Sequence, residues 1–488
     1  LPLNLIALIV AQIQDPGDLA RVCRTSRLLY YMTLPQLYQH VRLHSYDHIR
    51  YVHGRPEGFG GGSPFIMALN GFVTNSHAAI VQDFCVYGRW REAGVEDFAK
   101  GRVPDNSMML NILLRAATDK MTRLRSFSWE LDSKPLKPLY QGLTTHATLT
   151  SLTIKFPSAR IPRPTVLIPP IPSLRAFRAI DIDPLCYPDD ISLLLSTSPN
   201  LRDLRLHFSP RMRQAAEPTL SLQTYFGQCW KANYLPPLRH FALQNFFGHK
   251  AEGLDAIFDP ETLESATFLD TFGGLEGEGR HVFVDSTWRD LPRDMAVKCR
   301  VMRCNEVDEL HAELIGRSRG LEGFFVVGAR SRGARVGISP EGSAGVDQDP
   351  PPLPPPPPST STDPSMLALG STYLSALTTS HGATLRHLLL SPHWALTPSD
   401  ISNIVRYCPH LTQLGLATNS ASPHYLRLLM PFLPKLQALR VLENEFTREY
   451  LRVWEERERV EFLGRVLAGR EAEGVRVVGV GDVLYVLG

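Results

Sequence analysis

The sequence has little excess charge and no long apolar run. Its 488 residues carry a formal net charge of +2 at pH 7, which gives no electrostatic case for a dedicated nucleic-acid binder. No apolar run approaches the roughly 18–20 residues that a membrane-spanning helix needs. Hydrophobic residues still make up 43% of the chain, which is enough to build a core. We therefore expect a folded protein whose partners are neither nucleic acid nor a membrane.

Cysteine is also scarce. Seven cysteines are scattered along the chain without a dense framework, which favours a reducing compartment and hence a cytoplasmic and/or nuclear location. Cys299 and Cys304 lie close together, but no second Cys or His pair stands at zinc spacing. The sequence contains neither a phosphate-binding loop nor an HExxH motif. We therefore predict no metal site, no cofactor and no catalytic residue.

The first 45 residues have the pattern of a small helical unit. Leu5, Ile6, Ile9 and Ile13 recur at helical spacing, and the turn Asp15-Pro16-Gly17 ends that helix. A second apolar stripe begins at Leu19, Val22 and Cys23, and a third short helix, interrupted at Pro35, is expected over residues 28–38. A unit of this size has a marginal core, so it must dock onto a neighbour, a partner, or both.

This stretch resembles an F-box, in the form found in filamentous fungi. The matching features are Leu1-Pro2, the apolar positions Ile6, Ile9 and Ile13, Asp18-Leu19, Val22-Cys23-Arg24 and Ser26-Arg27. The resemblance implies binding to the Skp-family adaptor of a cullin–RING ligase. The residues that it places in that contact are Leu1, Pro2, Leu5, Ile9, Leu19, Val22 and Cys23. The alternative is that these residues form only an intramolecular helical cap.

A repeat follows. Nine segments share the frame that opens with Leu and has an apolar or small residue three places later, and most intervals are 25–27 residues. Their opening residues are Leu124, Leu149, Leu174, Leu201, Leu238, Leu263, Leu385, Leu411 and Leu436. The pattern L-x-x-L-x-L at this period is typical of leucine-rich repeats, in which a short strand points alternate leucines inward and a helix covers them. The segments between the frames have helical patterns.

The fold class expected is therefore α/β: a helical F-box followed by an irregular leucine-rich-repeat solenoid. We expect six segments, listed here in chain order. They are the F-box-like unit 1–45, a linking segment and N-terminal cap 46–120, repeats 121–329, a Gly/Ser/Pro-rich disordered insert 330–364, repeats 365–445, and a C-terminal helix and strand cap 446–488. The polyproline run in the insert is either an unstructured loop or a docking site for a proline-binding module.

The non-leucine residues of the strands are candidates for binding a substrate protein. They are Arg175, Arg178, Arg202, Arg205, Arg239, Arg386 and His387. Because they are basic or polar, an acidic or phosphorylated target segment is conceivable.

The sequence predicts a substrate-recognition adaptor of a Skp–cullin–F-box ubiquitin ligase, which would be a non-catalytic subunit with an unknown target protein. A repeat scaffold that does not assemble a ligase is one alternative. A serine hydrolase is another, because residues 316–320 fit G-x-S-x-G around Ser318. That motif needs a strand before the serine and a helix after it, and here the patterns run in the opposite order.

Overall fold

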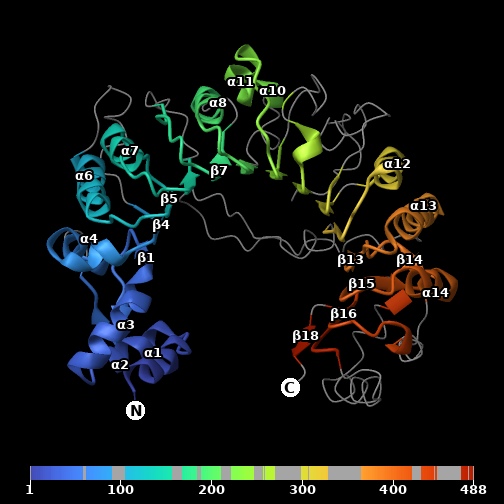
Figure 1. Cartoon of the computed structure of the whole chain (residues 1–488), viewed down its shortest axis with the longest axis horizontal. Coiled ribbons are helices and arrows are strands. Elements are labelled where there is room, and N and C mark those ends of the chain that lie inside the picture. The colour runs from blue at the N-terminus through green and yellow to red at the C-terminus, as the bar shows by residue number, and fades with distance from the viewer. Residues whose placement is uncertain are drawn as a thin grey trace, which may run out of the picture. The chain divides into compact units, whose positions relative to one another are not determined.

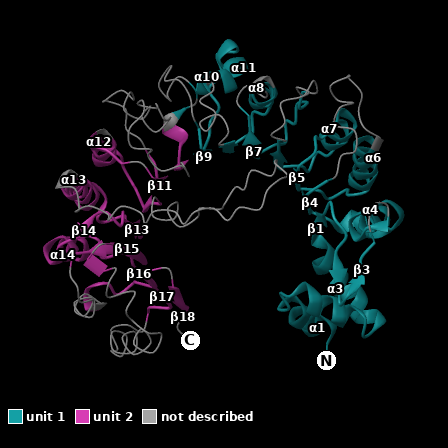
Figure 2. Cartoon of the chain, turned by 180° about the vertical axis from the view of Figure 1, so that it is seen from behind, with its two compact units in different colours: residues 1–252, 256–259 teal, residues 253–255, 260–488 magenta. Residues whose placement is uncertain are grey.

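The computed structural model divides the chain into two compact units (Figure 2). Unit 1 comprises Leu1–Glu252 and Ala256–Asp259, and unit 2 comprises Gly253–Asp255 and Pro260–Gly488. The residues whose structure is described are 2–58, 62–90, 105–156, 167–183, 188–209, 221–246, 257, 259–269, 298–305, 307–327, 364–419, 430–444, 446–447, 474–481 and 483–486. Within them the fold is mixed α/β, with mostly parallel strands and twelve α-helices.

Three helices open unit 1. They are α1 (Leu3–Ala11), α2 (Pro16–Cys23) and α3 (Arg27–Gln39). The Asp15 side chain accepts a hydrogen bond from the Asp18 N–H and caps α2, and Ser26 caps α3 in the same way. The expected interruption at Pro35 is wrong, because α3 continues through it. The helix packs along α2, and its Gln36 side chain donates to the Ile13 carbonyl at 2.7 Å.

The strands of unit 1 pair side by side in chain order, and every pair is parallel. They are β1 (His40–Ser45), β4 (Asp83–Gly88), β5 (Ser126–Leu131), β6 (Ser151–Lys155), β7 (Ala176–Ile182), β8 (Asp203–Phe208) and β9 (His240–Gln244). A separate hairpin is formed by β2 (Tyr51–Val52) and β3 (Arg55–Pro56). Because β1 belongs to this sheet, the three opening helices run directly into it.

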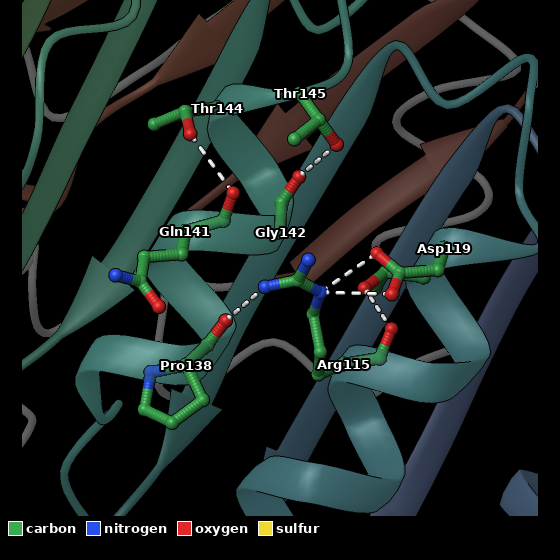
Figure 3. Close-up of polar contacts among 8 residues, drawn as sticks. Arg115, Asp119, Pro138, Gln141, Gly142, Thr144 and Thr145 are labelled. Atoms are coloured by element: carbon green, nitrogen blue, oxygen red, sulfur yellow. Dashed lines mark hydrogen bonds and ion pairs between the residues drawn. The ribbon is translucent and has the colours of Figure 1, made fainter.

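Helices connect the strands of unit 1 and lie on one side of them (Figure 1). They are α4 (Pro64–Thr74), α6 (Asp105–Asp119), α7 (Lys137–Thr144), α8 (Pro188–Thr197), α10 (Leu222–Tyr225) and α11 (Gly227–Lys231). Arg115 of α6 joins two of them: its Nη1 donates to the Pro138 carbonyl at 2.8 Å and its Nε to the Asp119 carboxylate (Figure 3). Gly142 of α7 lies against this arginine, and a Cβ there would be 2.3 Å from its Cδ.

The leucine frame explains where the strands begin. In all nine frames the strand starts two residues after the opening leucine, as Leu124 precedes Ser126 and Leu436 precedes Ala438. The opening leucine and the fourth residue are buried in each frame. In unit 1 the fourth residues lie in register across five strands, forming one buried row of Phe127, Leu152, Phe177, Leu204 and Phe241. The expected strands at these frames are confirmed.

Unit 2 repeats the arrangement. Its parallel strands, in chain order, are β10 (Ser265–Leu269), β11 (Val301–Cys304), β12 (Gly323–Val326), β13 (His387–Leu389), β15 (Gln413–Thr418), β16 (Ala438–Val441) and β17 (Val477–Val480). The short β14 (Ala395–Leu396) also pairs with β15. The helices are α12 (Glu309–Arg317), α13 (Pro364–His381) and α14 (Pro398–Tyr407), with a 3-10 turn at Met430–Phe432.

Within the described part of residues 270–370, where the sequence left the number of repeats open, the structure has two strands. Strands β11 and β12 follow frames opened by Cys299 and Leu321. Cys299, two residues before β11, and Cys304, its last residue, are both buried in the core, where they replace leucine. In the last segment the strand-like residues form a hairpin, in which β18 (Val483–Val486) runs antiparallel to β17 after Gly481 with φ 57°.

Some expectations concern residues outside the described ranges. The Gly/Ser/Pro-rich insert falls there up to residue 363, as does the expected helix over residues 450–467. In the part of the chain that is described, no helix is long and apolar enough to cross a membrane. The same residues contain no cluster of three or more potential metal ligands.

Candidate protein-interaction surfaces

Helix α1 leaves most of its apolar side chains exposed. Leu3, Leu5, Leu8 and Ile9 are between 42% and 61% exposed, and Val10 is the buried residue of this helix. Leu28 and Tyr31 of α3 are also exposed, at 44% and 60%. We call these six residues the helical apolar surface. Transferring such side chains out of water is favourable by about 25 cal/mol per Å², so these residues are candidates for a contact with a partner.

The residues predicted from the F-box resemblance fall into three groups. Pro2, Leu5 and Ile9 are exposed, Val22 and Cys23 are half-buried, and Leu1 lies outside the described residues. Leu19 corrects the prediction: it is 3% exposed and belongs to the core of the helical unit, so its side chain is not available to a partner.

Sequence reasoning missed Leu3, Leu8, Leu28 and Tyr31 as surface residues. The signal was present in α1, whose apolar residues occupy every face of the helix instead of one stripe. A helix apolar all round is normally buried. Here only part of α1 packs against the rest of the chain, and its remaining apolar side chains are exposed.

The second candidate surface is the open face of the unit 1 sheet, formed by the strand residues that alternate with the buried ones. Arg178 and Arg205 are neighbours there, in register between Thr153 and Ala242. Arg205 donates through Nε and Nη2 to both oxygens of Asp203, at 2.9 and 2.8 Å. These bonds raise the pKa of Arg205 against the opposing effect of burial. Its charge is therefore compensated, whereas Arg178 makes no ion pair with a described residue.

Three more predicted arginines stand at the strand starts. Arg175, Arg202 and Arg239 each come one residue before β7, β8 and β9. The Arg202 N–H donates to the Arg175 carbonyl at 2.9 Å, and the Arg239 N–H to the Arg202 carbonyl at 2.8 Å. The structure thus brings together three residues that are 27 and 37 positions apart in the sequence. Arg125, one residue before β5, occupies the same place and was missed, although it shares their frame position.

Arg386 and His387 belong to unit 2: Arg386 directly precedes β13 and His387 is its first residue. The Arg386 backbone is hydrogen-bonded to Glu322 on one side and to Thr412 on the other. The His387 ring stacks on Phe325, with centroids 6.3 Å apart and planes 19° apart. Burial is the main cause that lowers the pKa of His387, which favours a neutral ring on this surface.

A polar cluster at the ends of β7–β9 was not foreseen. Asp181 has a φ of 57° at a break in the β7–β8 register, and its carboxylate lies 3.4 Å from Nδ1 of His207 and 3.7 Å from Lys155. Asn245, with a φ of 56°, reaches Nε2 of His207 at 3.3 Å. Burial, together with Arg178 and Lys155, lowers the pKa of His207 against the opposing charge of Asp181.

Ser318, the residue of the hydrolase alternative, lies beside His381, with 3.2 Å between Oγ and Nε2. Both groups also bond the Ile315 carbonyl at 2.8 Å, so they satisfy an end of α12. Ser318 and His381 are 3% and 1% exposed. A nucleophile elbow needs an exposed hydroxyl between a strand and a helix, whereas this serine follows a helix and is buried. The pair has the geometry of a helix cap.

No protein-family model matches the chain, and no curated protein matches its sequence. Among solved structures, it is similar to a crystal structure of a Rad7 and Elc1 complex in yeast, with a TM-score of 0.36 and 12% identity. The match covers 72% of this chain and 88% of that chain. Similarity at this level does not transfer a function, so function must be argued from the residues described above.

Proposed function

We propose that this protein is a substrate-recognition adaptor of a Skp–cullin–F-box ubiquitin ligase. In this proposal the helices α1–α3 are a divergent F-box that binds the Skp-family adaptor, and the strands and helices that follow are irregular leucine-rich repeats that bind a target protein. The chain would be a non-catalytic subunit acting in the cytoplasm and/or the nucleus. The observation that carries the proposal is the helical apolar surface, on the segment whose sequence resembles an F-box.

The repeat assignment is supported by the match between frame and structure. Each frame begins a strand two residues after its first leucine, and neighbouring strands are parallel and in chain order. The helices that connect the strands of unit 1 lie on one face of them and leave the other face open (Figure 1). Stacked repeats of this kind bury a continuous core and present an extended face for a partner.

Docking of an adaptor fits the size of the helical apolar surface. Fully burying a Leu or Ile side chain stabilises by about 1.5–3 kcal/mol. Six large side chains that are already 42–61% exposed can therefore contribute several kcal/mol, from which association subtracts the cost of lost translational and rotational freedom. The described residues of this chain leave these six side chains 42–61% exposed, so a partner could bury them further.

The test is co-purification with a Skp-family adaptor. The full chain with Leu5→Asp and Ile9→Asp should lose the adaptor, because two charges would be buried without partners in the contact. Leu235→Asp is the matched control: it is 46% exposed in the same unit but remote in sequence from the helical apolar surface, and it should retain the adaptor.

Equal recovery of the adaptor by all three proteins would refute the proposal. If the unchanged chain retains other cellular proteins but no adaptor or cullin, the scaffold alternative is the better account. A deletion used for the same purpose should stop before His40, because removing β1 exposes the hydrogen-bonding edge of β4.

A further inference from the structure

A short hairpin, formed by β2 and β3, lies in the segment that connects β1 to α4. Its two strands have their main contacts with each other. We call residues 51–56 the hairpin tip, and all six are exposed. Tyr51 is 69% exposed and Val52 is 40% exposed, and Ile49, just before the tip, is 50% exposed. The hairpin therefore leaves three neighbouring apolar side chains in water.

The conformation of the tip is fixed by its turn and by its base. His53 and Gly54 have φ values of 51° and 76°, as the two central positions of a type I′ turn require. At the base, the Glu57 N–H donates to the Arg50 carbonyl at 2.7 Å, and the Tyr46 hydroxyl donates to the Glu57 carboxylate at 3.0 Å. The tip is therefore held in one shape before it meets a partner, which lowers the entropic cost of binding.

The charge of the tip is positive. Glu57, one of the two acids between β1 and α4, lies 3.9 Å from Arg50. Asp47, the other acid, lies 3.9 Å from Arg89. Arg55 is exposed and makes no ion pair with a described residue. The tip itself contains no acid, so it combines apolar side chains with an uncompensated cation.

The apolar side chains of the tip lie on both faces of the two-stranded ribbon. Tyr51 pairs with Pro56, and Val52 pairs with Arg55. Because successive residues of a strand point to opposite faces, Tyr51 and Val52 are on different faces. A flat protein surface covers one face of a ribbon, whereas a tip that enters the surface of a bilayer is surrounded on both. Exposure on both faces therefore favours a lipid surface over a flat protein partner.

We propose that the hairpin tip binds the surface of an anionic membrane. Tyr51 and Val52 enter the boundary between headgroups and acyl chains, and Arg55 contacts the anionic headgroups. Tyrosine suits this boundary because its ring is apolar and its hydroxyl stays in water. Arginine is attracted to a leaflet that carries anionic lipids. Because few side chains insert, the binding is reversible and depends on the amount of anionic lipid.

Such a contact differs from a membrane span. The sequence led us to expect no membrane partner, because it lacks an apolar run of spanning length. A hairpin tip at the bilayer surface needs no such run. The proposal goes beyond ligase assembly and does not depend on it.

Co-sedimentation of the full chain with vesicles tests the proposal. The probes are vesicles of phosphatidylcholine alone and vesicles of phosphatidylcholine mixed with phosphatidylserine. The chain should bind the mixed vesicles at least about fivefold more strongly, which corresponds to the roughly 1 kcal/mol that one arginine gains near an anionic leaflet. Binding should weaken as salt is raised, because the attraction between Arg55 and the headgroups is screened.

Variants locate the contact. Tyr51→Asp with Val52→Asp should weaken binding to the mixed vesicles at least about tenfold, whereas Tyr51→Phe should retain it, because the ring remains. Arg55→Glu should abolish the preference for mixed vesicles over phosphatidylcholine alone. Trp230→Asp with Leu235→Asp is the matched control, because these side chains are 59% and 46% exposed in the same unit and the change adds the same two charges. The control should change binding less than about twofold.

All variants should retain the Skp-family adaptor if the unchanged chain binds it, so the two proposals can fail separately. Equal binding to both kinds of vesicle, unchanged binding of the variant with Tyr51→Asp and Val52→Asp, or an equal loss in the control would overturn the inference. A variant that loses a co-purifying protein, while the unchanged chain binds no vesicles, would identify the hairpin as a protein contact and overturn the inference as well.

Discussion

Truncating Leu8 and Leu19 to alanine should separate the adaptor contact from the stability of the helical unit. The two residues belong to neighbouring helices but differ in environment, since Leu8 is 61% exposed and Leu19 is 3% exposed. Leu19→Ala removes buried methyl groups and leaves a cavity, which costs about 2–5 kcal/mol. Leu8→Ala removes groups that are mostly in water, so its effect on stability should stay within about 0.5 kcal/mol.

The effects on binding should differ as well. Full burial of a leucine side chain is worth about 1.5–3 kcal/mol, and the exposed 61% of Leu8 is the part that a partner can still cover. Leu8→Ala should therefore weaken adaptor binding by about 1–2 kcal/mol, or roughly 5- to 30-fold. Leu19→Ala should weaken binding only as far as it unfolds the unit.

Hydrogen exchange of peptides from α2 and α3 provides the stability measurement, because a chain of two units has no single free energy of unfolding. Exchange there should accelerate at least about 30-fold for Leu19→Ala, the factor that corresponds to about 2 kcal/mol, and hardly at all for Leu8→Ala. Surface plasmon resonance with immobilised adaptor gives the affinities. Equal acceleration by both variants would show that α1 is not packed as described, and unchanged affinity for Leu8→Ala would remove this helix from the contact.

Further predictions concern the packing of the repeats. Gly142→Ala should lower the stability of unit 1 by about 1–3 kcal/mol in urea unfolding, because its Cβ overlaps an arginine; Gly316→Ala, whose Cβ has ordinary contacts, should be neutral or stabilising. Asn111→Leu should cost about 1–3 kcal/mol, because the buried Asn111 accepts from a backbone N–H at 2.8 Å, and normal hydrogen exchange near α7 would contradict this. Burial lowers the pKa of His381 in the folded state. The stability that the neutral His381 ring contributes is therefore complete above about pH 6.5, the ordinary pKa of histidine, and is lost as the pH falls through the folded-state pKa. His381→Gln should reduce the loss of thermal stability between pH 7.5 and 5, and an unchanged loss would refute that.

Sequence alone determined the nine strands that follow the leucine frames, because the information there is local. A leucine, two variable residues and a second apolar residue place side chains on one face of a short strand wherever the frame occurs, and the nine frames behave alike. Frames opened by Val81, Cys299, Leu321 and Val475 were missed. Val81, Cys299 and Val475 fill the buried position that leucine fills in the other frames, but a search for leucine does not find them. The caps of α2 and α3 are local too, since Asp15 and Ser26 each accept from an N–H three residues away, but they were not assigned from the sequence: Asp18 was the expected cap of α2, and it is the donor to Asp15 instead.

The tertiary structure decided what lies far apart in sequence. It showed that Leu19 of α2 is buried in the core and that Leu8 of α1 is exposed. This distinction depends on how the two helices pack and not on the helical period. It showed that His381 lies beside Ser318 and that both side chains bond the Ile315 carbonyl at the end of α12, which is the geometry of a helix cap. It also placed Arg175, Arg202 and Arg239 on neighbouring strand starts, although they are 27 and 37 positions apart in the sequence. Composition shows only that arginine is frequent. The parallel register sets neighbouring strands about 4.8 Å apart, and this places arginines from distant parts of the sequence next to one another.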